Sequence, residues 1–297
     1  MDVSVIIVNF NTSTLLHRCL HSIKEKTFGV EYEIIVIDNA SSDDSVRFVK
    51  SNHADVHVIE SETNIGFGKA NNLGSEQAKG KYLFFLNSDT ELLNDAISHL
   101  FHFMETHPRC GIAGGNLVNA SGDPTHSYRR TLPGPISELY RFIPSLIPIV
   151  EGKNWHFNHT RKPMEVGYIT GADMMIRRDL FTRLGAFDPD FFMYYEEAEL
   201  TRRVRNSGQK AYSVPAARIL HLKGSSLEFL SSAKSVVYRS KYLYLKKTYG
   251  PRAAWRAHWY FQFYCYYKRL LHILFGSTAG KDRYERMAIL DRSIYYE

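Results

Sequence analysis

The 297-residue sequence predicts an α/β fold of the doubly wound type, a mostly parallel, mixed sheet with helices on both faces. Short apolar runs alternate with helical segments along the first 120 residues, the pattern of strand–helix–strand units. The apolar runs end in small polar residues, as strands do where an open α/β sheet binds a ligand. The length allows one large α/β domain and a smaller appendage.

The expected strands are short, apolar and bounded by polar turns. A helical pattern follows the first of them, beginning at Ser13 with Leu16 and Leu20 on one face. Shorter helical patterns follow the next strands, up to about His107. The strands are expected at residues 3–8, 32–37, 56–59, 82–86 and 111–118.

The second half of the chain is less regular. Residues 120–165 hold most of the prolines and many aromatics, and a loop region of this length is usually functional. Residues 167–189 predict a strand, a helix and a turn, and residues 191–214 predict an acidic helix start, a basic helix body and a strand. We therefore expect a catalytic domain at 1–226, with halves at about 1–118 and 119–226, and a helical region at 227–297.

The C-terminal region has an unusual composition. From Leu227 to Phe275 it is helical by pattern and dense in Tyr, Trp, Arg and Lys. The apolar stretch between Arg256 and Lys268 is shorter than the roughly 20 residues of a spanning helix. Interleaved aromatic and basic residues are typical of a helix in the membrane interface. The alternative is a helix packed on its own domain with snorkelling basic side chains.

Charge and cysteine usage limit the partners and the compartment. The net charge of +6 and the pI near 9.0 permit an anionic partner, such as nucleic acid, a phosphorylated substrate or a membrane surface. The three cysteines have no metal-type spacing and suit a reducing compartment. The N-terminus starts apolar without a basic segment, which indicates a first strand rather than a signal peptide. A cytoplasmic location is expected.

Polar residues end the first two predicted strands. Phe10 and Asn11 follow the first strand, and Asp38 and Asn39 follow the second. A fixed carboxylate at Asp38 can accept the imide N–H of a uracil or thymine ring. The alternative for Asp38 is an Asx-turn, because the residues after it share that turn chemistry. The residues leave both interpretations open.

A glycine-containing loop precedes the next helical segment. Asn64, Gly66 and Phe67 form a tight turn, with Asn72 on the helix that follows. A backbone without a Cβ atom at Gly66 can approach a ribose or pyrophosphate closely. These four residues are candidates for binding a nucleotide.

The fourth strand, within KYLFFLNSDTELL, ends in Asn87, Ser88 and Asp89. One interpretation is a helix N-cap, with Ser88 or Asp89 capping a helix that runs through Leu92 and Leu100. The other is a metal and phosphate site at the carboxyl end of a parallel strand.

Seven motifs in order resemble glycosyltransferase family 2, and most closely its rhamnosyltransferase-like branch, which builds bacterial surface polysaccharides. The resemblance covers about residues 2–225 and implies a GT-A fold. The C-terminal region carries no signature of the family. The motifs are VSVIIVNFN, VIDNASSDDS, NIGFGKANN, FLNSDTEL, GADMMIRR, FMYYEEAEL and LHLKG.

The resemblance implies a divalent cation between the protein and the donor diphosphate. Asn87-Ser88-Asp89 stands where the family has an Asp-x-Asp type motif, so Asp89 is implied as a ligand, with Asn87 and Ser88 in the donor site. His221 matches the position of a second ligand in related enzymes. Oxygen ligands suit Mg²⁺, and imidazole favours Mn²⁺.

The resemblance also implies the residues of the reaction. Glu197 is implied as the general base and Glu196 as its acidic neighbour, where relatives carry Glu-Asp or Asp-Asp. The alternative for these acids is complementation of a helix dipole. Gly171, Ala172 and Asp173 are implied on the acceptor side.

The expected activity is metal-dependent, inverting hexosyl transfer. The donor is expected to be dTDP-rhamnose or a UDP-hexose, and the acceptor a growing surface polysaccharide or a polyprenyl-linked saccharide at the cytoplasmic face of the inner membrane. Peripheral membrane contact through the C-terminal helices is expected, and nucleic acid is not an expected partner. The alternatives are a sugar-nucleotide binder without turnover, a nucleic-acid-binding protein and a nucleotide-dependent oxidoreductase. The turn after the first strand, NFNTST, lacks the Gly-x-Gly-x-x-Gly motif, which disfavours the oxidoreductase.

Overall fold

The computed structural model describes residues 1–135, 137, 140, 146–222, 233–275 and 277–296. The chain divides into two units, which we describe separately. The sheet unit comprises residues 1–132, 154–192 and 196–231, and the helical unit comprises residues 133–153, 193–195 and 232–297. The expected boundary after residue 226 lies outside the described residues, so the predicted domain division stays a prediction.

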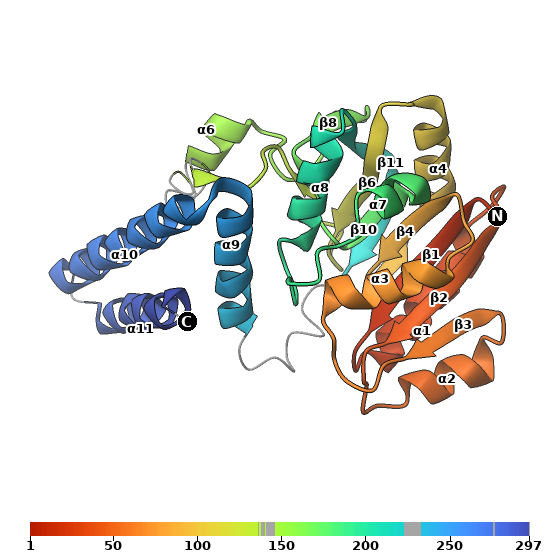
Figure 1. Cartoon of the computed structure of the whole chain (residues 1–297), viewed down its shortest axis with the longest axis horizontal. Coiled ribbons are helices and arrows are strands. Elements are labelled where there is room, and N and C mark those ends of the chain that lie inside the picture. Colours follow the sequence, from red (N-terminus) through yellow and green to blue (C-terminus); the bar gives the residue numbers. More distant parts are fainter. Residues whose placement is uncertain (136, 138–139, 141–145, 223–232, 276, 297) are drawn as a thin grey trace. The chain divides into compact units, whose positions relative to one another are not determined.

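The sheet unit is built on a nine-stranded sheet with the order β3-β2-β1-β4-β10-β6-β11-β5, and β8 pairs with β11 (Figure 1). Strands β3, β2, β1 and β4 are parallel, as are β6 and β11, whereas β10, β5 and β8 run antiparallel to their neighbours. The bounds are β1 Val3–Asn9, β2 Tyr32–Asp38, β3 Val56–Glu60, β4 Tyr82–Leu86, β5 Thr90–Leu92, β6 Cys110–Val118, β8 Met164–Val166, β10 Asp173–Arg177 and β11 Lys210–His221.

Helices cover both faces of this sheet, so the predicted mostly parallel, mixed, doubly wound fold is confirmed (Figure 1). Alternate residues of β1 point to opposite faces, which places Val5 in one core with Leu16 of α1 and Ile6 in the other with Ala70 of α3. The helices are α1 Ser13–Lys26, α2 Ser45–Asn52, α3 Phe67–Gln77, α4 Ala96–Thr106, α7 Arg178–Arg183 and α8 Glu196–Asn206.

The cap interpretation of the fourth strand end is wrong. Strand β5 follows Asp89 directly, and helix α4 begins only at Ala96. Its N-cap is Asp95, whose Oδ1 accepts the backbone N–H of Ser98 at 3.4 Å. The cluster from Asn87 to Asp89 therefore has no capping role.

The region expected to be a long loop contains short regular elements. A two-stranded sheet joins β7 (Tyr128–Arg129) to β9 (Tyr168–Ile169). Helix α6 (Ile147–Glu151), in the helical unit, lies within the same stretch of sequence.

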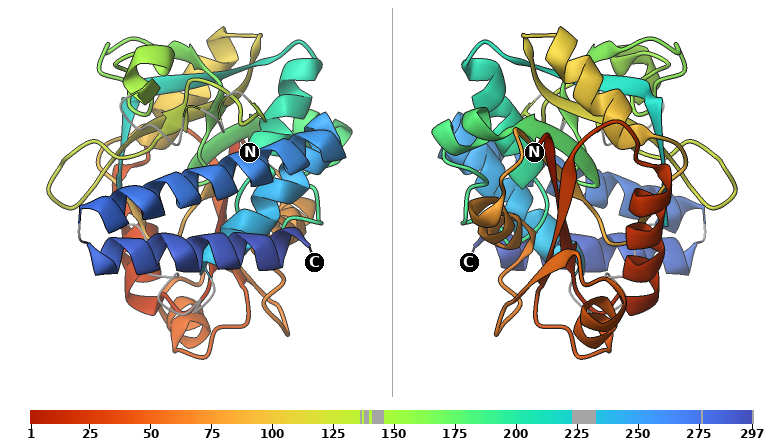
Figure 2. Two further views of the ribbon diagram at one scale, coloured as in Figure 1. Left: turned by 90° about the vertical axis from the view of Figure 1, so that its left-hand side faces the viewer. Right: turned by 90° about the vertical axis from the view of Figure 1, so that its right-hand side faces the viewer.

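The helical unit contains α9 (Ala233–Tyr249), α10 (Pro251–Leu274) and α11 (Thr278–Tyr295), as the helical pattern predicts for the described part of 227–275. Helices α10 and α11 lie side by side (Figure 2). Buried polar groups join them, since Asp291 of α11 lies 2.7 Å from His258 and accepts a hydrogen bond from Gln262 at 2.9 Å. Among the helices that the structure describes, none has the length and apolarity needed to cross a bilayer.

Candidate active site

The ends of β1 and β2 are joined by side-chain hydrogen bonds. Asn9 and Asp38 are paired in register on these parallel strands, and the Asn9 amide donates to Asp38 Oδ1 and to Ser41 Oγ, both at 3.0 Å. The other carboxylate oxygen of Asp38 accepts the backbone N–H of Ser41 at 2.9 Å. Asp38 is 4% exposed. The carboxylate is thus fixed by a turn of the kind that the alternative interpretation describes.

The loop before α3 is attached to the end of β2. The Asn39 amide donates to Asn64 Oδ1 at 2.9 Å, and the Gly66 N–H donates to the same oxygen at 3.0 Å. Gly66 has a φ of 85°, and a Cβ atom there would lie 2.3 Å from the carbonyl oxygen of Phe192. The Phe67 N–H donates to that carbonyl at 2.7 Å. The protein's own backbone therefore requires this glycine.

The end of β4 contacts β1 on one side and β10 on the other. Ser88 Oγ lies 2.8 Å from Thr12 Oγ1, and Thr12 donates to Asn9 Oδ1 at 2.7 Å. The Asn87 N–H donates to the Ala172 carbonyl at 3.0 Å. Thr12 thus connects two strand ends through a single hydroxyl group.

These contacts close into a ring around the carboxyl edge of the sheet. Phe67 and Gly171 complete the ring by a close approach rather than a hydrogen bond. The phenylalanine ring lies 3.2 Å from the position that a Cβ atom on Gly171 would take. The structure therefore brings most of the predicted donor residues and two acceptor residues together, while their roles stay predictions. We call the set the edge ring, in the order Asp38, Asn39, Asn64, Gly66, Phe67, Gly171, Ala172, Asn87, Ser88, Thr12 and Asn9.

Phe10 and Asn11 lie in the turn between β1 and α1. Asn11 has a φ of 54°, a left-handed conformation that asparagine tolerates better than most residues. Its Oδ1 accepts the backbone N–H of Ser42 at 2.7 Å, and its own N–H donates to Ser41 Oγ at 3.0 Å. These bonds hold the two turns after β1 and β2 against each other.

The two implied metal ligands lie side by side next to the edge ring. His221 Nε2 is 3.3 Å from Asp89 Oδ1, because β11 pairs with β5 and places His221 opposite Thr90. Two ligands about 2.1 Å from one cation lie at most about 4.2 Å apart, so this pair fits a shared Mg²⁺ or Mn²⁺. No cluster of three His, Cys, Asp or Glu side chains that could hold a metal occurs among the described residues. The diphosphate and water would have to supply the other ligands.

Cys19 is buried next to this site, with its Sγ 3.8 Å from Thr90 Oγ1. Burial raises the pKa of the Cys19 thiol to about 12, and the nearby carboxylates of Asp89 and Glu91 add to the increase. The thiol therefore stays protonated at neutral pH, and a protonated thiol is not a nucleophile.

The acidic start of α8 lies against α3. Glu196 is buried, and its Cβ and Cγ would be 3.8 Å from a Cβ atom placed on Gly68 of α3. Glu197 is half-buried. The two residues before the helix, Tyr194 and Tyr195, both have a φ of 71°, a conformation that is costly for aromatic residues.

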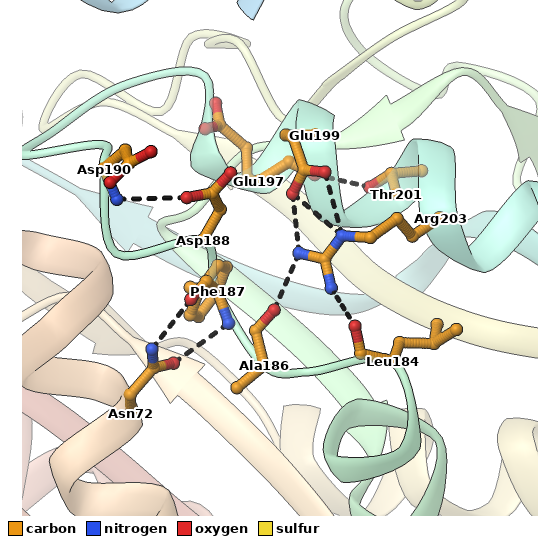
Figure 3. Close-up of polar contacts among 10 residues, drawn as sticks. All are labelled: Asn72, Leu184, Ala186, Phe187, Asp188, Asp190, Glu197, Glu199, Thr201 and Arg203. Carbon is orange, nitrogen blue, oxygen red and sulfur yellow. Dashed lines mark hydrogen bonds and ion pairs between the residues drawn. The ribbon is translucent and has the colours of Figure 1, made fainter. Parts of the chain in front are cut away.

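Arg203 holds α8 to the preceding turn (Figure 3). Its guanidinium donates to both carboxylate oxygens of Glu199 at 2.6 to 2.9 Å and also to the carbonyl oxygens of Leu184 and Ala186. These five hydrogen bonds engage every nitrogen atom of the Arg203 guanidinium group. One of the three glutamates of this turn is thus committed to structure.

Two predicted binding residues have their side chains occupied. The Asn72 amide donates to the Phe187 carbonyl at 2.8 Å and accepts the Phe187 N–H at 3.0 Å (Figure 3). Asp173 is fully buried in β10, where Oδ2 accepts the Gly115 N–H at 2.6 Å, and burial raises its carboxyl pKa well above the usual range. The geometry therefore gives no support to a donor role for Asn72 or an acceptor role for the Asp173 side chain.

Sequence reasoning missed Thr12 and Ser41. Both are small hydroxyl residues in the turns after β1 and β2, where turn and cap roles are common enough to hide any other role. The only available signal was their position within NFNTST and NASSD, immediately after two strands whose carboxyl ends share one edge.

Comparisons with known sequences agree with this architecture. A family model described as glycosyl transferase family 2 matches residues 4–185. The low-salt glycan biosynthesis hexosyltransferase Agl10 of Haloferax volcanii is 30% identical over 208 residues, 69% of this chain and 62% of that protein. The N-acetylglucosaminyl-diphospho-decaprenol L-rhamnosyltransferase of Mycobacterium tuberculosis is 24% identical over 270 residues, 85% of this chain and 86% of the relative. The chain thus spans less than two thirds of the first relative.

Solved structures show the same fold. GalNAc-T7 with UDP, GalNAc and Mn²⁺ matches with a TM-score of 0.61 and 20% identity, over 81% of this chain and 47% of that one. Residues 1–349 of S. aureus TarS with UDP match with a TM-score of 0.55 and 17% identity, over 82% of this chain and 65% of that one. At these identities the likeness concerns the fold, and the predicted GT-A class is confirmed.

Proposed function

Because the chain belongs to glycosyl transferase family 2, as its motifs predict, we propose that it transfers a hexose from a nucleoside diphosphate sugar to a hydroxyl group of a growing surface polysaccharide or lipid-linked saccharide. The edge ring carries this proposal, because it gathers polar residues from three parallel strand ends, where sheets of this type bind ligands. The relatives named as rhamnosyl- and hexosyltransferases support dTDP-rhamnose or a UDP-hexose as donor.

Asp38 is the residue we assign to the nucleobase. Its carboxylate is held by Asn9 and Ser41, so a pyrimidine imide N–H would meet an acceptor that is already oriented. A preoriented acceptor loses little conformational freedom when the ligand binds. Two structural neighbours hold UDP, which has such an imide group.

Asp89 and His221 are the residues we assign to a divalent cation. The cation would neutralise negative charge on the diphosphate, which is the chemistry that metal ions supply in phosphoryl and glycosyl donors. The structural neighbour GalNAc-T7 holds Mn²⁺. The imidazole of His221 favours Mn²⁺ over Mg²⁺ in this chain.

Glu197 is the residue we assign as general base, with Glu196 as its acidic neighbour. The Glu197 carboxylate takes the proton of the acceptor hydroxyl, whose oxygen bonds to the anomeric carbon. The bond from that carbon to the diphosphate oxygen breaks, and the electron pair leaves with the nucleoside diphosphate. Attack opposite the leaving group inverts the anomeric configuration.

The test is to replace Glu197 by Gln and Glu76 by Gln as a matched control. Glu76 is exposed on α3 and lies outside the edge ring. We expect Glu197→Gln to bind donor normally by calorimetry and to lose about 10²- to 10⁴-fold in transfer, the range for a general base. Glu76→Gln should transfer at the wild-type rate. Full transfer by Glu197→Gln would refute the base assignment.

A second candidate is a sugar-nucleotide binder without turnover. The motif Asn87-Ser88-Asp89 retains one acid, and Glu197 is one methylene longer than an aspartate. Both are departures from the pattern of the family, and they favour this alternative. The test is to offer the wild-type protein several nucleoside diphosphate sugars. Binding of one of them without hydrolysis or transfer, with or without Mn²⁺, would establish this function.

We also propose that the protein acts at the cytoplasmic face of a membrane. The name of the mycobacterial relative includes a diphospho-decaprenol, which is a lipid carrier. An acceptor of this kind is confined to a bilayer, so the enzyme that uses it must reach the bilayer surface.

A further inference from the structure

One side of α10 carries large apolar side chains that are exposed to solvent. Phe263 is 71% exposed and Leu274 is 70% exposed, whereas large apolar residues in folded proteins are usually buried. A contiguous exposed patch of this kind marks an interaction surface. We call it the α10 face, and its residues are Trp255, Trp259, Tyr260, Phe263, Tyr266, Tyr267, Leu270, Ile273 and Leu274.

The α10 face is a single stripe along the helix. With 3.6 residues per turn, its nine residues fall within an arc of about 140° and span about 29 Å of helix length. The opposite arc is buried in the helical unit through the small residues Ala253, Ala254 and Ala257 and through Phe261 and Cys265.

Buried polar contacts fix which side of α10 faces outward. His258 lies 2.7 Å from Asp291 of α11, and Gln262 donates to the Asp291 carboxylate and to the Ala288 carbonyl, both at 2.9 Å. Rotating α10 to bury the aromatic rings would break these contacts and leave buried polar groups without partners, which is costly. The exposure of the α10 face is therefore built into the helical unit.

The charged residues of α10 itself all have one sign. No acidic residue occurs between residues 251 and 281, whereas Arg252 and Arg256 lie within the same arc as the aromatic residues. Lys268 and Arg269 lie farther round the helix, and Arg269 is paired with Glu285 at 3.3 Å. Trp and Tyr side by side with Arg match the headgroup level of a bilayer, where rings meet the acyl boundary and cations meet phosphates.

We propose that the α10 face binds the surface of an anionic lipid bilayer, with α10 lying in the plane of the interface. The proposal deepens the proposed function, since it rests on the proposed action at a membrane and assigns the contact to one helix face. A second copy of the chain fits this face less well. Parallel pairing of two α10 faces about a twofold axis would bring Arg252 and Arg256 of both copies close together, because both lie at the start of the helix. Antiparallel pairing would place these arginines beside the apolar end of the other helix, where no acidic residue of α10 offers them a partner.

The first test uses the full chain with vesicles of phosphatidylglycerol and phosphatidylcholine, and with phosphatidylcholine alone. We expect binding to the anionic vesicles that weakens at least 10-fold with phosphatidylcholine alone, with Arg252→Gln/Arg256→Gln, or with Trp259→Gln/Phe263→Gln. The matched control Phe28→Gln, at an exposed phenylalanine of the sheet unit, should bind within 2-fold of wild type. Equal vesicle binding by the α10 variants and wild type would overturn the proposal.

The second test uses the three tryptophans of the chain. The Trp155→Phe variant leaves Trp255 and Trp259 as reporters, and both belong to the α10 face. We expect their emission to shift to the blue with anionic vesicles and to be quenched by lipids brominated on the acyl chains. An unshifted, unquenched emission, or a lipid-free dimer that Trp259→Gln/Phe263→Gln dissociates, would overturn the proposal in favour of another occupant.

Transfer to a water-soluble acceptor separates this proposal from the proposed function. The α10 variants should transfer to such an acceptor at the wild-type rate, because no residue of the α10 face belongs to the edge ring. Loss of vesicle binding with intact transfer supports the lipid surface. Vesicle binding by a wild-type chain that transfers no sugar would overturn the enzymatic proposal alone.

Discussion

Replacing Arg203 by Met should destabilise the sheet unit far more than a surface ion pair would. The guanidinium of Arg203 is bonded to both oxygens of Glu199 and to two backbone carbonyls in the turn after α7, those of Leu184 and Ala186. Methionine keeps much of the side-chain volume and removes every one of these donors. The substitution therefore isolates the polar contacts from the packing.

The size of the effect follows from burial. The side chain of Arg203 is 25% exposed and that of Glu199 is 15% exposed. Removing one partner of a fully buried pair costs about 3–5 kcal/mol, whereas an exposed pair contributes about 0–1 kcal/mol. With a quarter of the arginine in water, we expect Arg203→Met to lower the free energy of unfolding by about 2–4 kcal/mol.

Arg183→Met is a matched control. Arg183 also pairs with an acid four residues away, Asp179, but the atoms are 3.5 Å apart and the side chains are 60% and 56% exposed. An exposed pair of this kind contributes little, so we expect a change within about 0.5 kcal/mol.

Urea denaturation measures both variants. A Trp255→Phe/Trp259→Phe background leaves Trp155, which lies in the sheet unit, as the fluorescence reporter. With an m-value of about 2 kcal/mol per molar urea, Arg203→Met should shift the midpoint downward by about 1–2 M. Midpoints of the two variants within 0.3 M of each other would refute the structural role of Arg203.

A double-mutant cycle tests the pair itself. Glu199→Gln removes the charge that Arg203→Met leaves without its cation, so the double variant should be more stable than the sum of the single effects predicts, by about 1–2 kcal/mol. Strict additivity would show that Arg203 acts only through the carbonyls of Leu184 and Ala186.

Three further predictions concern single positions. Gly66→Ala should lower the free energy of unfolding, measured by urea denaturation, by at least about 3 kcal/mol, against about 1–2 kcal/mol for the control Gly29→Ala. Both positions have a positive φ, but only a Cβ atom at Gly66 would meet a backbone oxygen. Equal losses in the two variants would contradict the clash. Burial raises the pKa of the Asp173 carboxyl, so this group contributes most to stability below about pH 4, and the contribution falls as the pH rises toward the pKa of the folded state. Asp173→Asn should therefore have a higher free energy of unfolding than wild type at pH 8. The same pH dependence of stability in both proteins would contradict this prediction. Mn²⁺ should raise the Tm of the UDP-bound protein, and EDTA should return the Tm to its value without metal. His221→Ala and Asp89→Asn should each abolish the increase, and an increase retained in both variants would contradict the metal assignment.

The fold could be predicted because its signals are local. The apolar run at residues 3–8 and the later apolar runs predict strands, and the helical pattern from Ser13 places a helix between two of them. The GT-A class and the family followed from motif order, and both are confirmed. Strand order and the antiparallel insertion of β10 between β4 and β6 depend on contacts between distant segments, so no local pattern predicts them.

The candidate site could be predicted in part. Strand ends identified Asp38, Asn39 and Asp89, because the carboxyl ends of parallel strands meet at one edge. The strand ends do not indicate which polar side chains are already hydrogen-bonded within the protein. Asn72 is an amide like Asn39, yet its partner, the backbone of Phe187, lies 115 positions away in the sequence. Whether an acid is buried also depends on residues far away in the sequence. The burial of Asp173, whose partner is the backbone of Gly115, could therefore not be predicted.

The closed form of the edge ring changes what a single substitution can do. In an open series of contacts, cutting one link separates the residues on either side. In a closed series a second route of contacts remains after one is lost, in addition to the backbone pairing of β1 with β2 and β4. If the Thr12 hydroxyl is lost, for example, Ser88 is still connected to Asp38 through the other side of the ring. That route runs through Asn87, Ala172 and the loop before α3. Loss of one side-chain contact, such as that of the Thr12 hydroxyl, can therefore leave the three strand ends aligned, whereas a side chain at Gly66 meets the backbone of Phe192 directly.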